Sequence, residues 1–188
     1  MSNRITRHLP VNPAGIDEAG ALLREGRLVA FPTETVYGLG ADATNALAVA
    51  GIYEAKGRPR FNPLIIHVAD QDEARTYAHV PPRAEALMSQ FWPGPLTLVL
   101  PLREGATISE LALAGHSSIA VRMPSHPVAH AIIKASRRPI AAPSANLSGH
   151  VSPTMADHVI EDLEGRIDAV VMGDATEVGV ESTILSLL

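Results

Sequence analysis

Short runs of apolar and β-branched residues alternate along the chain with longer segments in which apolar residues recur at helical spacing. Between residues 127 and 136, Val128, Ile132 and Ile133 fall on one helical face, and Pro127 suits the first turn of a helix. This alternation of strand and helix patterns predicts an α/β fold. The predicted strands are Leu28–Phe31, Leu64–Val68, Leu96–Leu100, Ile119–Met123, Ile140–Ala142, Ala169–Met172 and Ser182–Leu185, and the predicted helices are Ile16–Arg24, Asn45–Lys56, Gln71–Ala78, Arg83–Gln90, Pro127–Ser136 and Met155–Leu163.

The length of the chain, 188 residues, fits one domain, and no break in composition divides it. We therefore predict a single domain over residues 1–188. Prolines follow several predicted strands, where the chain leaves the sheet, and sites in α/β proteins usually lie at strand ends. The functional residues are accordingly expected in the loops that follow the strands.

Composition narrows the class of protein further. The chain has no cysteine, which excludes disulfides, thiolate catalysis and Cys-ligated metal sites. The first residues contain no apolar run typical of a signal peptide, and no segment is long and apolar enough to cross a membrane. We therefore expect a cytoplasmic protein that does not engage a membrane.

The formal net charge of -5 conceals an uneven distribution. Residues 55–69 and 111–156 together hold seven of the 15 cations and none of the 20 acids, which leaves -12 for the rest of the chain. If the two stretches meet in the fold, they form a positive cleft on an acidic body, suited to a polyanionic small molecule. The alternative is that these are solvated Lys and Arg side chains on helix faces.

Several familiar motifs are absent, including the phosphate loop GxxxxGK[ST], the zinc helix HExxH and the nucleophile elbow GxSxG. Gly38 and Gly40 formally match a dinucleotide fingerprint but do not follow the strand directly, so we interpret them as sites of a turn or of close backbone approach. His126 and His130 have helical spacing but no carboxylate nearby, so we assign no metal to them.

Two loops carry candidate binding groups. In the segment 31–40, the hydroxyls of Thr33 and Thr35 could bind a small ligand or could satisfy the amides of an ordinary turn. In the segment 56–63, Lys56, Arg58 and Arg60 follow a helix, where cations complement the helix dipole. Because the glycine and prolines of that segment force a rigid loop, the three cations resemble a phosphate clamp more than a solvated face.

Three more segments are ambiguous when taken alone. Arg122 ends an apolar strand with no acid near it in sequence, so its partner is either a ligand carboxylate or a distant Asp or Glu. His67, on another strand, has the default interpretation of a half-buried histidine with satisfied hydrogen bonds. The short polar groups of residues 142–149 and 181–183 could bind a nucleotide or merely cap secondary structure.

Taken together and in order, these segments resemble the YrdC-like family of threonylcarbamoyl-AMP synthases. The matching segments are PTETVYGLG at 32–40, KGRPRFNPL at 56–64, WPGPLTLVL at 92–100, AVRMP at 120–124, APSANLSG at 142–149, SPT at 152–154 and VESTI at 180–184. The resemblance implies an α/β domain with a twisted mixed β-sheet and flanking helices around a positively charged cavity. It also implies that L-threonine, bicarbonate and ATP, with Mg²⁺ accompanying ATP, react to give threonylcarbamoyl-AMP and pyrophosphate.

The resemblance also assigns roles to residues. It implies that Thr33, His67, Arg122 and Ser182 hold threonine, that Lys56, Arg58, Asn62, Ser144 and Asn146 hold ATP, and that Ser118, Ala142 and Ser152 line the same cavity, with Ser118 and Ser152 counted on the ATP side. Lys56 and Arg58 are the expected catalytic cations, because charge accumulates on phosphoryl oxygens when a carbamate attacks the α-phosphate. No residue stands out as the general base; Glu34 is a speculative candidate.

The product would pass to a tRNA threonylcarbamoyl transferase complex, which modifies adenosine 37 of tRNAs that read ANN codons. Family members usually continue beyond the last matching strand with an arm that bears an arginine, so we expect this arm to be short or missing here. An alternative from a different class is a non-catalytic module that binds tRNA or double-stranded RNA weakly through the same positive surface.

Overall fold

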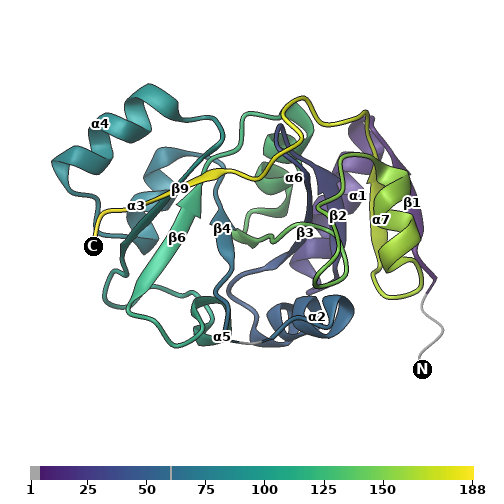
Figure 1. Cartoon of the computed structure of the whole chain (residues 1–188), viewed down its shortest axis with the longest axis horizontal. Helices are drawn as coiled ribbons and strands as arrows, with labels where there is room; N and C mark the ends of the chain where they lie inside the picture. The colour runs from purple at the N-terminus through teal and green to yellow at the C-terminus, as the bar shows by residue number, and fades with distance from the viewer. Residues whose placement is uncertain (1–4, 60) are drawn as a thin grey trace.

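The computed structural model describes residues 5–59 and 61–188. Helices and strands alternate along the chain, as the sequence pattern predicted (Figure 1). Arg60, the third cation of the predicted clamp, lies outside the described residues. In chain order the elements are β1 (Arg7–Pro10), α1 (Pro13–Arg24), β2 (Val29–Pro32), β3 (Tyr37–Asp42), α2 (Ala46–Lys56), β4 (Ile65–His67), α3 (Gln71–Tyr77), α4 (Pro82–Phe91), β5 (Leu96–Pro101), α5 (Glu110–Leu113), β6 (Ser118–Arg122), α6 (Pro127–Ser136), β7 (Ile140–Ala141), α7 (Ala156–Leu163), β8 (Ala169–Met172) and β9 (Thr183–Ser186).

Within the described residues, nine strands form one mixed sheet in the order β1-β8-β2-β3-β7-β4-β6-β5-β9. The pairs β4/β6 and β5/β9 are parallel, whereas β7 runs antiparallel to β3 and β4. The prediction of a mixed sheet with flanking helices is therefore confirmed. The last strand brings residues near the end of the chain beside β5, which the sequence places far earlier.

Each face of the sheet buries its own core, because successive residues of a strand point to opposite faces. On β2, Val29 and Phe31 belong to one core and Ala30 to the other. Helices α1 and α6 cover the face that contains Val29 and Phe31, whereas α2, α3, α4, α5 and α7 contribute to the core on the other face. The two faces are therefore both apolar, and polar groups collect where strands end.

Strand β3 was not predicted, because its residues include two glycines and show no alternation of apolar and polar positions. The whole strand is buried and pairs with β2 and β7. A Cβ on Gly40 would lie 2.6 Å from Phe31 Cε1 and 3.0 Å from Ile140 Cγ2, so the glycine permits a close approach between strands. The expectation of close approach was right, and that of a turn was wrong.

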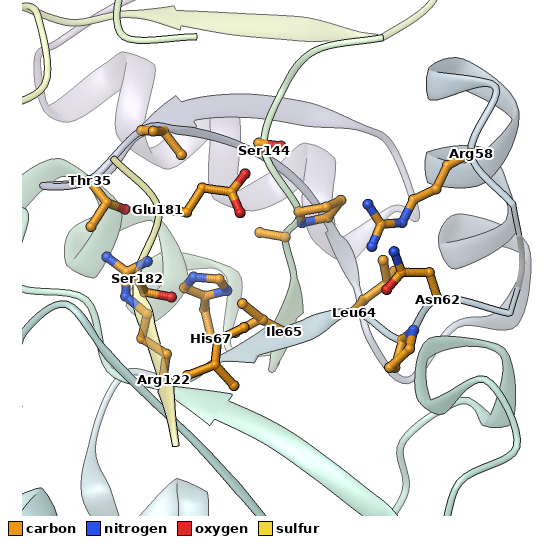
Figure 2. A pocket seen from close by; sticks show the side chains of 15 residues that line it. Thr35, Arg58, Asn62, Leu64, Ile65, His67, Arg122, Ser144, Glu181 and Ser182 are labelled. Carbon is orange, nitrogen blue, oxygen red and sulfur yellow. The ribbon is translucent and has the colours of Figure 1, made fainter. Parts of the chain in front are cut away.

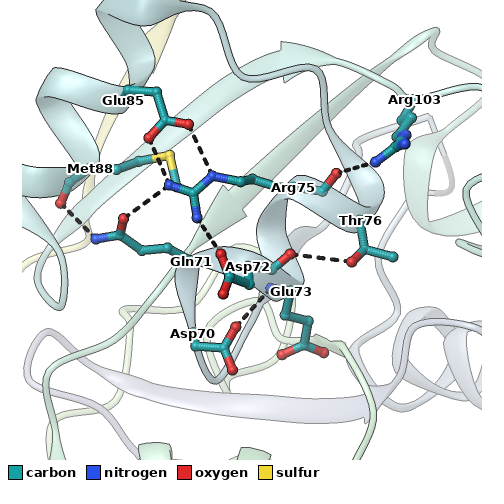
Figure 3. A network of polar contacts seen from close by, with 9 residues as sticks. All are labelled: Asp70, Gln71, Asp72, Glu73, Arg75, Thr76, Glu85, Met88 and Arg103. Atoms are coloured by element: carbon teal, nitrogen blue, oxygen red, sulfur yellow. Dashed lines mark hydrogen bonds and ion pairs between the residues drawn. The ribbon is translucent and has the colours of Figure 1, made fainter.

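Helices α3 and α4 are joined by a polar network centred on Arg75 (Figure 3). Its guanidinium donates to both carboxylate oxygens of Glu85, at 2.9 and 2.7 Å, and to Asp72 Oδ1 at 2.7 Å. The bidentate contact to Glu85 links the two helices, and the contact to Asp72 lies within α3. This network is partly exposed and contains none of the predicted site residues.

Candidate functional site

A cavity of about 260 Å³ opens at the ends of β4, β6 and β7, beside the start of β9. Figure 2 shows side chains from these elements converging on it. Residues from both acid-free stretches line the cavity, so the two stretches do meet in the fold. The lining residues are Thr35, Val36, Arg58, Asn62, Pro63, Leu64, Ile65, His67, Arg122, Ala142, Pro143, Ser144, Glu181, Ser182 and Ile184.

At one end of the cavity, Arg122 and His67 lie side by side. They are paired residues on the parallel strands β6 and β4, and paired residues project from the same face of a sheet. Arg122 Nη2 forms an ion pair with Glu34 Oε1 at 2.7 Å, and Arg122 Nε donates to the Gly94 carbonyl oxygen at 3.4 Å. Of the two partners that the sequence allowed for Arg122, a ligand carboxylate or a distant acid, the structure shows a distant acid, Glu34.

The ion pair between Arg122 and Glu34 is almost completely buried, with only 4% and 5% of the two residues exposed. Neither carboxylate oxygen of Glu34, nor Arg122 Nη2, makes a well-aligned hydrogen bond with any residue that the structure describes. Charge therefore holds the Arg122 guanidinium against Glu34, and Arg122 also lines the cavity.

His67 is buried, and its burial lowers the pKa of its imidazole to about 3, with a further contribution from the neighbouring Arg122 charge. Its Nδ1 has no hydrogen-bond partner among the described residues. A histidine in this environment stays neutral at physiological pH. It can therefore exchange hydrogen bonds with a ligand but cannot serve as a cation.

The threonines of the loop between β2 and β3 have different roles. Thr33 Oγ1 donates to the Val36 carbonyl oxygen at 2.6 Å and accepts from the amides of Thr35 and Val36, so Thr33 closes a turn and does not line the cavity. Because the Thr33 proton is used in this way, Thr35 must donate in the 2.9 Å contact between the two hydroxyls. The oxygen of Thr35, which does line the cavity, can then accept a hydrogen bond from a ligand.

Ser182 reaches the cavity because β9 pairs with β5. The hydroxyl of Ser182 lies 2.8 Å from Thr97 Oγ1 on β5, and this contact orients it beside Arg122 (Figure 2). Of the four residues that the resemblance assigned to threonine, His67, Arg122 and Ser182 line the cavity and Thr33 lies behind it. Their roles as ligands of threonine stay a prediction.

At the other end of the cavity, Arg58 and Asn62 line the wall (Figure 2), and Ser144 also lines the cavity. Gly57 ends α2 in the left-handed conformation, with φ of 59°, and directs the chain into the loop that carries Arg58. Burial lowers the pKa of Arg58, and its Nε has no hydrogen-bond partner in the described part of the chain. Arg58 therefore presents a half-buried cation to this end of the cavity.

Lys56 lies behind the cavity wall. Its Nζ donates to the carbonyl oxygens of Ser144 and Asn146, and its own carbonyl oxygen accepts from the Ser148 amide. Burial, reinforced by the Arg58 charge, lowers the pKa of Lys56 to about 8. The ammonium therefore ties the loop 144–148 to the end of α2 and retains one N–H for another partner.

Besides Lys56, three residues assigned to the ATP side do not line the cavity. Asn146 donates to the carbonyl oxygens of Leu147 and His150, and thereby supports the loop from within. Ser118 begins β6, four residues before Arg122 and therefore about 13 Å along the strand from it. Ser152 donates to Glu181 Oε1 at 2.7 Å and so contacts the cavity through that side chain.

Glu181 is a lining residue to which the sequence interpretation gave no role. Its position directly before Ser182, in the polar segment 181–183, is the sequence signal that indicates a place near the cavity. Two acids from outside the acid-free stretches therefore contribute to this region: Glu181 in the wall, and Glu34 behind Arg122. The net charge of the cavity is thus less positive than the two stretches alone implied.

Neither a metal cluster nor a membrane helix appears in the described part of the chain. Residues 5–59 and 61–188 contain no group of three or more His, Cys, Asp or Glu side chains placed to hold a metal ion. His126 caps α6 by accepting from the Val128 amide, and His130 Nε2 contacts the Ala69 carbonyl oxygen at 2.8 Å. None of the helices in these residues has the length and apolar character needed to cross a bilayer.

Comparison with known proteins decides the family. The family model for Sua5, YciO and YrdC proteins, described as "Telomere recombination", matches residues 21–188. This chain belongs to the Sua5/YciO/YrdC family. Family membership agrees with the resemblance that the ordered motifs indicated.

Curated members of the Sua5/YciO/YrdC family are similar to this chain over most of its length. The threonylcarbamoyl-AMP synthase of Bacillus subtilis is 55% identical over 97% of this chain and 53% of its own length. That of Pyrococcus abyssi is 54% identical over 90% of this chain and 49% of its own length. The chain thus spans about half the length of the curated relatives it matches.

Solved structures of the Sua5/YciO/YrdC family share the fold described above. The structure of P. abyssi Sua5 complexed with L-threonine superposes with a TM-score of 0.93 at 50% identity, covering 97% of this chain and 54% of that one. Escherichia coli YciO superposes with a TM-score of 0.82 at 25% identity, covering all of this chain and 91% of its own.

Proposed function

We propose that this chain makes threonylcarbamoyl-AMP from L-threonine, bicarbonate and Mg–ATP, with release of pyrophosphate. The observation that carries the proposal is a single cavity with the guanidinium of Arg122 at one end and that of Arg58 at the other. The first suits an amino-acid carboxylate and the second suits a phosphate chain. The names of curated relatives at 54–55% identity, and the threonine complex of a structure at 50% identity, support the same assignment.

At the amino-acid end, the guanidinium of Arg122 would bind the carboxylate of threonine. Thr35, Ser182 and His67 surround the same space and offer hydroxyl and imidazole groups to the threonine side chain and amine. A hydroxyl contact in a buried site discriminates against valine, because valine would leave the polar group of the protein unpaired. We assign this contact to Thr35, whose oxygen retains acceptor capacity, rather than to Thr33.

The chemistry requires positioning more than a protein nucleophile. The amine of threonine and bicarbonate condense to a carbamate with loss of water. A carbamate oxygen then attacks the α-phosphorus, and the bond to the bridging oxygen breaks to release pyrophosphate. Mg²⁺, which enters with ATP, supplies neutralisation of phosphate charge. Arg58 would stabilise charge that develops on the phosphoryl oxygens, and Lys56 would contribute its charge from behind the cavity wall.

We further propose that the product passes to a tRNA threonylcarbamoyl transferase complex for modification of adenosine 37 in tRNAs that read ANN codons. The product is a mixed carbamoyl–phosphoryl anhydride, which is activated for transfer of its threonylcarbamoyl group, and the identity of the acceptor is what the family resemblance implies. The names of the curated relatives bear on the synthesis of this product and not on its transfer.

The test is one incubation with ATP, Mg²⁺, bicarbonate and radiolabelled threonine, followed by chromatography of the labelled products. We expect labelled threonylcarbamoyl-AMP, with pyrophosphate released in equal amount, and loss of both when bicarbonate is removed. Binding of threonine and ATP without this product would contradict the synthase assignment. RNA binding with a steep salt dependence and no product would instead favour the non-catalytic module.

A further inference from the structure

Glu181 places a carboxylate in a cavity that the proposed function fills with a triphosphate. The residue precedes β9 and lines the cavity together with Arg58 and Ser144. Figure 2 shows its side chain between the group formed by Thr35, Ser182 and Arg122 and the group formed by Arg58 and Asn62. A carboxylate at this position faces the junction between the amino-acid end and the phosphate end of the cavity.

The carboxylate of Glu181 is fixed at one oxygen and available at the other. Ser152 Oγ donates to Oε1 at 2.7 Å, whereas Oε2 forms no hydrogen bond or ion pair with the residues that the structure describes. The negative charge of Glu181 raises the pKa values of Lys56 and Arg58, whereas burial, the larger effect, lowers them. The cavity wall therefore combines cations with one oriented anion.

A free triphosphate entering this cavity would meet repulsion from Glu181 as well as attraction from Arg58. A divalent cation between the carboxylate and the phosphates reverses the sign of that interaction. Mg²⁺ prefers oxygen ligands, retains several waters and is commonly held by one or two carboxylates together with substrate phosphates. The described residues contain no cluster of three or more metal-binding side chains, so a single carboxylate anchor fits this mode better than a protein cage.

We propose that Glu181, oriented by Ser152, holds the hydrated Mg²⁺ of Mg–ATP and makes the cavity select the Mg²⁺ complex over the free nucleotide. This inference rests on the proposed function, because it requires ATP in the cavity. It adds a protein ligand, direct or through water, to a cation otherwise carried by the phosphates. Ser152 is then a positioning residue for the metal rather than a contact of the nucleotide.

The experiment compares the affinity of α,β-methylene-ATP, which cannot be cleaved at the reacting bond, with Mg²⁺ present and with EDTA, by calorimetry. In the unaltered chain we expect the Mg²⁺ complex to bind more tightly. In Glu181→Gln we expect this preference to fall by about tenfold, with the free nucleotide binding more tightly than before. Ser152→Ala should shift the preference in the same direction by a smaller factor.

The matched control is Glu177→Gln, which removes the same charge from an exposed residue of the same segment outside the cavity wall. This variant should keep the preference of the unaltered chain. A second readout uses Mn²⁺ in place of Mg²⁺: the electron paramagnetic resonance signal of free Mn²⁺ should decrease when protein and nucleotide are both present, and should decrease less with Glu181→Gln.

Two results would overturn the inference while leaving the synthase proposal intact. One is an unchanged Mg²⁺ preference in Glu181→Gln. The other is an equal loss of affinity with and without Mg²⁺, which would assign the carboxylate to the ribose hydroxyls. Failure of the unaltered chain to bind the nucleotide at all would refute the proposed function itself, so the two failures are distinguishable.

Discussion

Burial of a neutral His67 should lower the free energy of unfolding of this protein in mild acid. Its pKa is lowered from 6.5 to about 3 in the folded chain, chiefly by burial. Between these values the unfolded chain binds a proton that the folded chain does not, so the free energy of unfolding falls as pH falls. At pH 4.5, two units below the ordinary pKa, this single group should remove about 3 kcal/mol of stability relative to pH 7.

The assay is urea unfolding at pH 7 and pH 4.5 for the unaltered chain and for His67→Gln, in which the side chain cannot titrate. Other groups also respond to acid, so the informative quantity is the difference between the two pH-dependent changes, expected at about 3 kcal/mol. His158→Gln, an exposed histidine of α7, serves as the control and should lose stability in acid as the unaltered chain does. Equal acid sensitivity in His67→Gln and the unaltered chain, or an imidazole of His67 that titrates near pH 6.5 by NMR, would refute the reasoning.

Three further predictions concern the charged residues around the cavity. Arg58→Ala should lower formation of threonylcarbamoyl-AMP by about a hundredfold or more while changing the free energy of unfolding by less than about 1 kcal/mol, and unchanged turnover would remove Arg58 from the phosphate end. Glu34→Gln should lower the free energy of unfolding by about 3 kcal/mol, because it leaves the Arg122 charge buried without a counter-ion. In urea titrations, adding Arg122→Met should recover part of this loss, and additive effects of the two substitutions would contradict the coupling. The pKa of Lys56 is lowered from 10.5 to about 8 in the folded chain. Between pH 8 and 10.5 the unfolded chain therefore binds a proton that the folded chain does not, so the free energy of unfolding should rise with pH. Lys56→Met should abolish this rise, as measured by thermal unfolding at several pH values in that range.

The elements with a clear apolar pattern were predictable from the sequence, either from apolar residues at helical spacing, as in α6, or from a continuous apolar run, as in β8. Helix α6 and strand β8 have the predicted bounds, Pro127–Ser136 and Ala169–Met172. Strand β3 could not be found in this way, since its two glycines interrupt the apolar run and serve a close approach between strands. The short elements β1 and α5 were also missed: β1 has the sequence RHLP with one buried residue, and α5 is a single turn, so neither shows an apolar run or a helical period.

The candidate site was predictable as a set of segments but less so as a set of side chains. The motifs identified the loops that converge on the cavity, yet side-chain direction within a loop depends on turn geometry. Thr33 and Thr35 are equivalent in the sequence pattern, but the hydrogen bonds of the turn direct only Thr35 to the cavity. The pairing of Arg122 with Glu34 depends on tertiary contact between distant segments, which no local spacing encodes.

The two acids at the cavity sharpen what the charge pattern means. A wall of cations alone would attract any polyanion, whether nucleotide, RNA or free phosphate. Glu34 offsets the charge of Arg122 at one end of the cavity, and Glu181, which lies between the two ends (Figure 2), offsets part of the charge of Arg58. A ligand must then supply two complementary charges. One is a carboxylate that competes with Glu34 for Arg122, and the other is a cation that lies between the ligand phosphates and Glu181 and screens their repulsion. Zwitterionic threonine and Mg–ATP meet these conditions, whereas an RNA backbone supplies neither group at a fixed position.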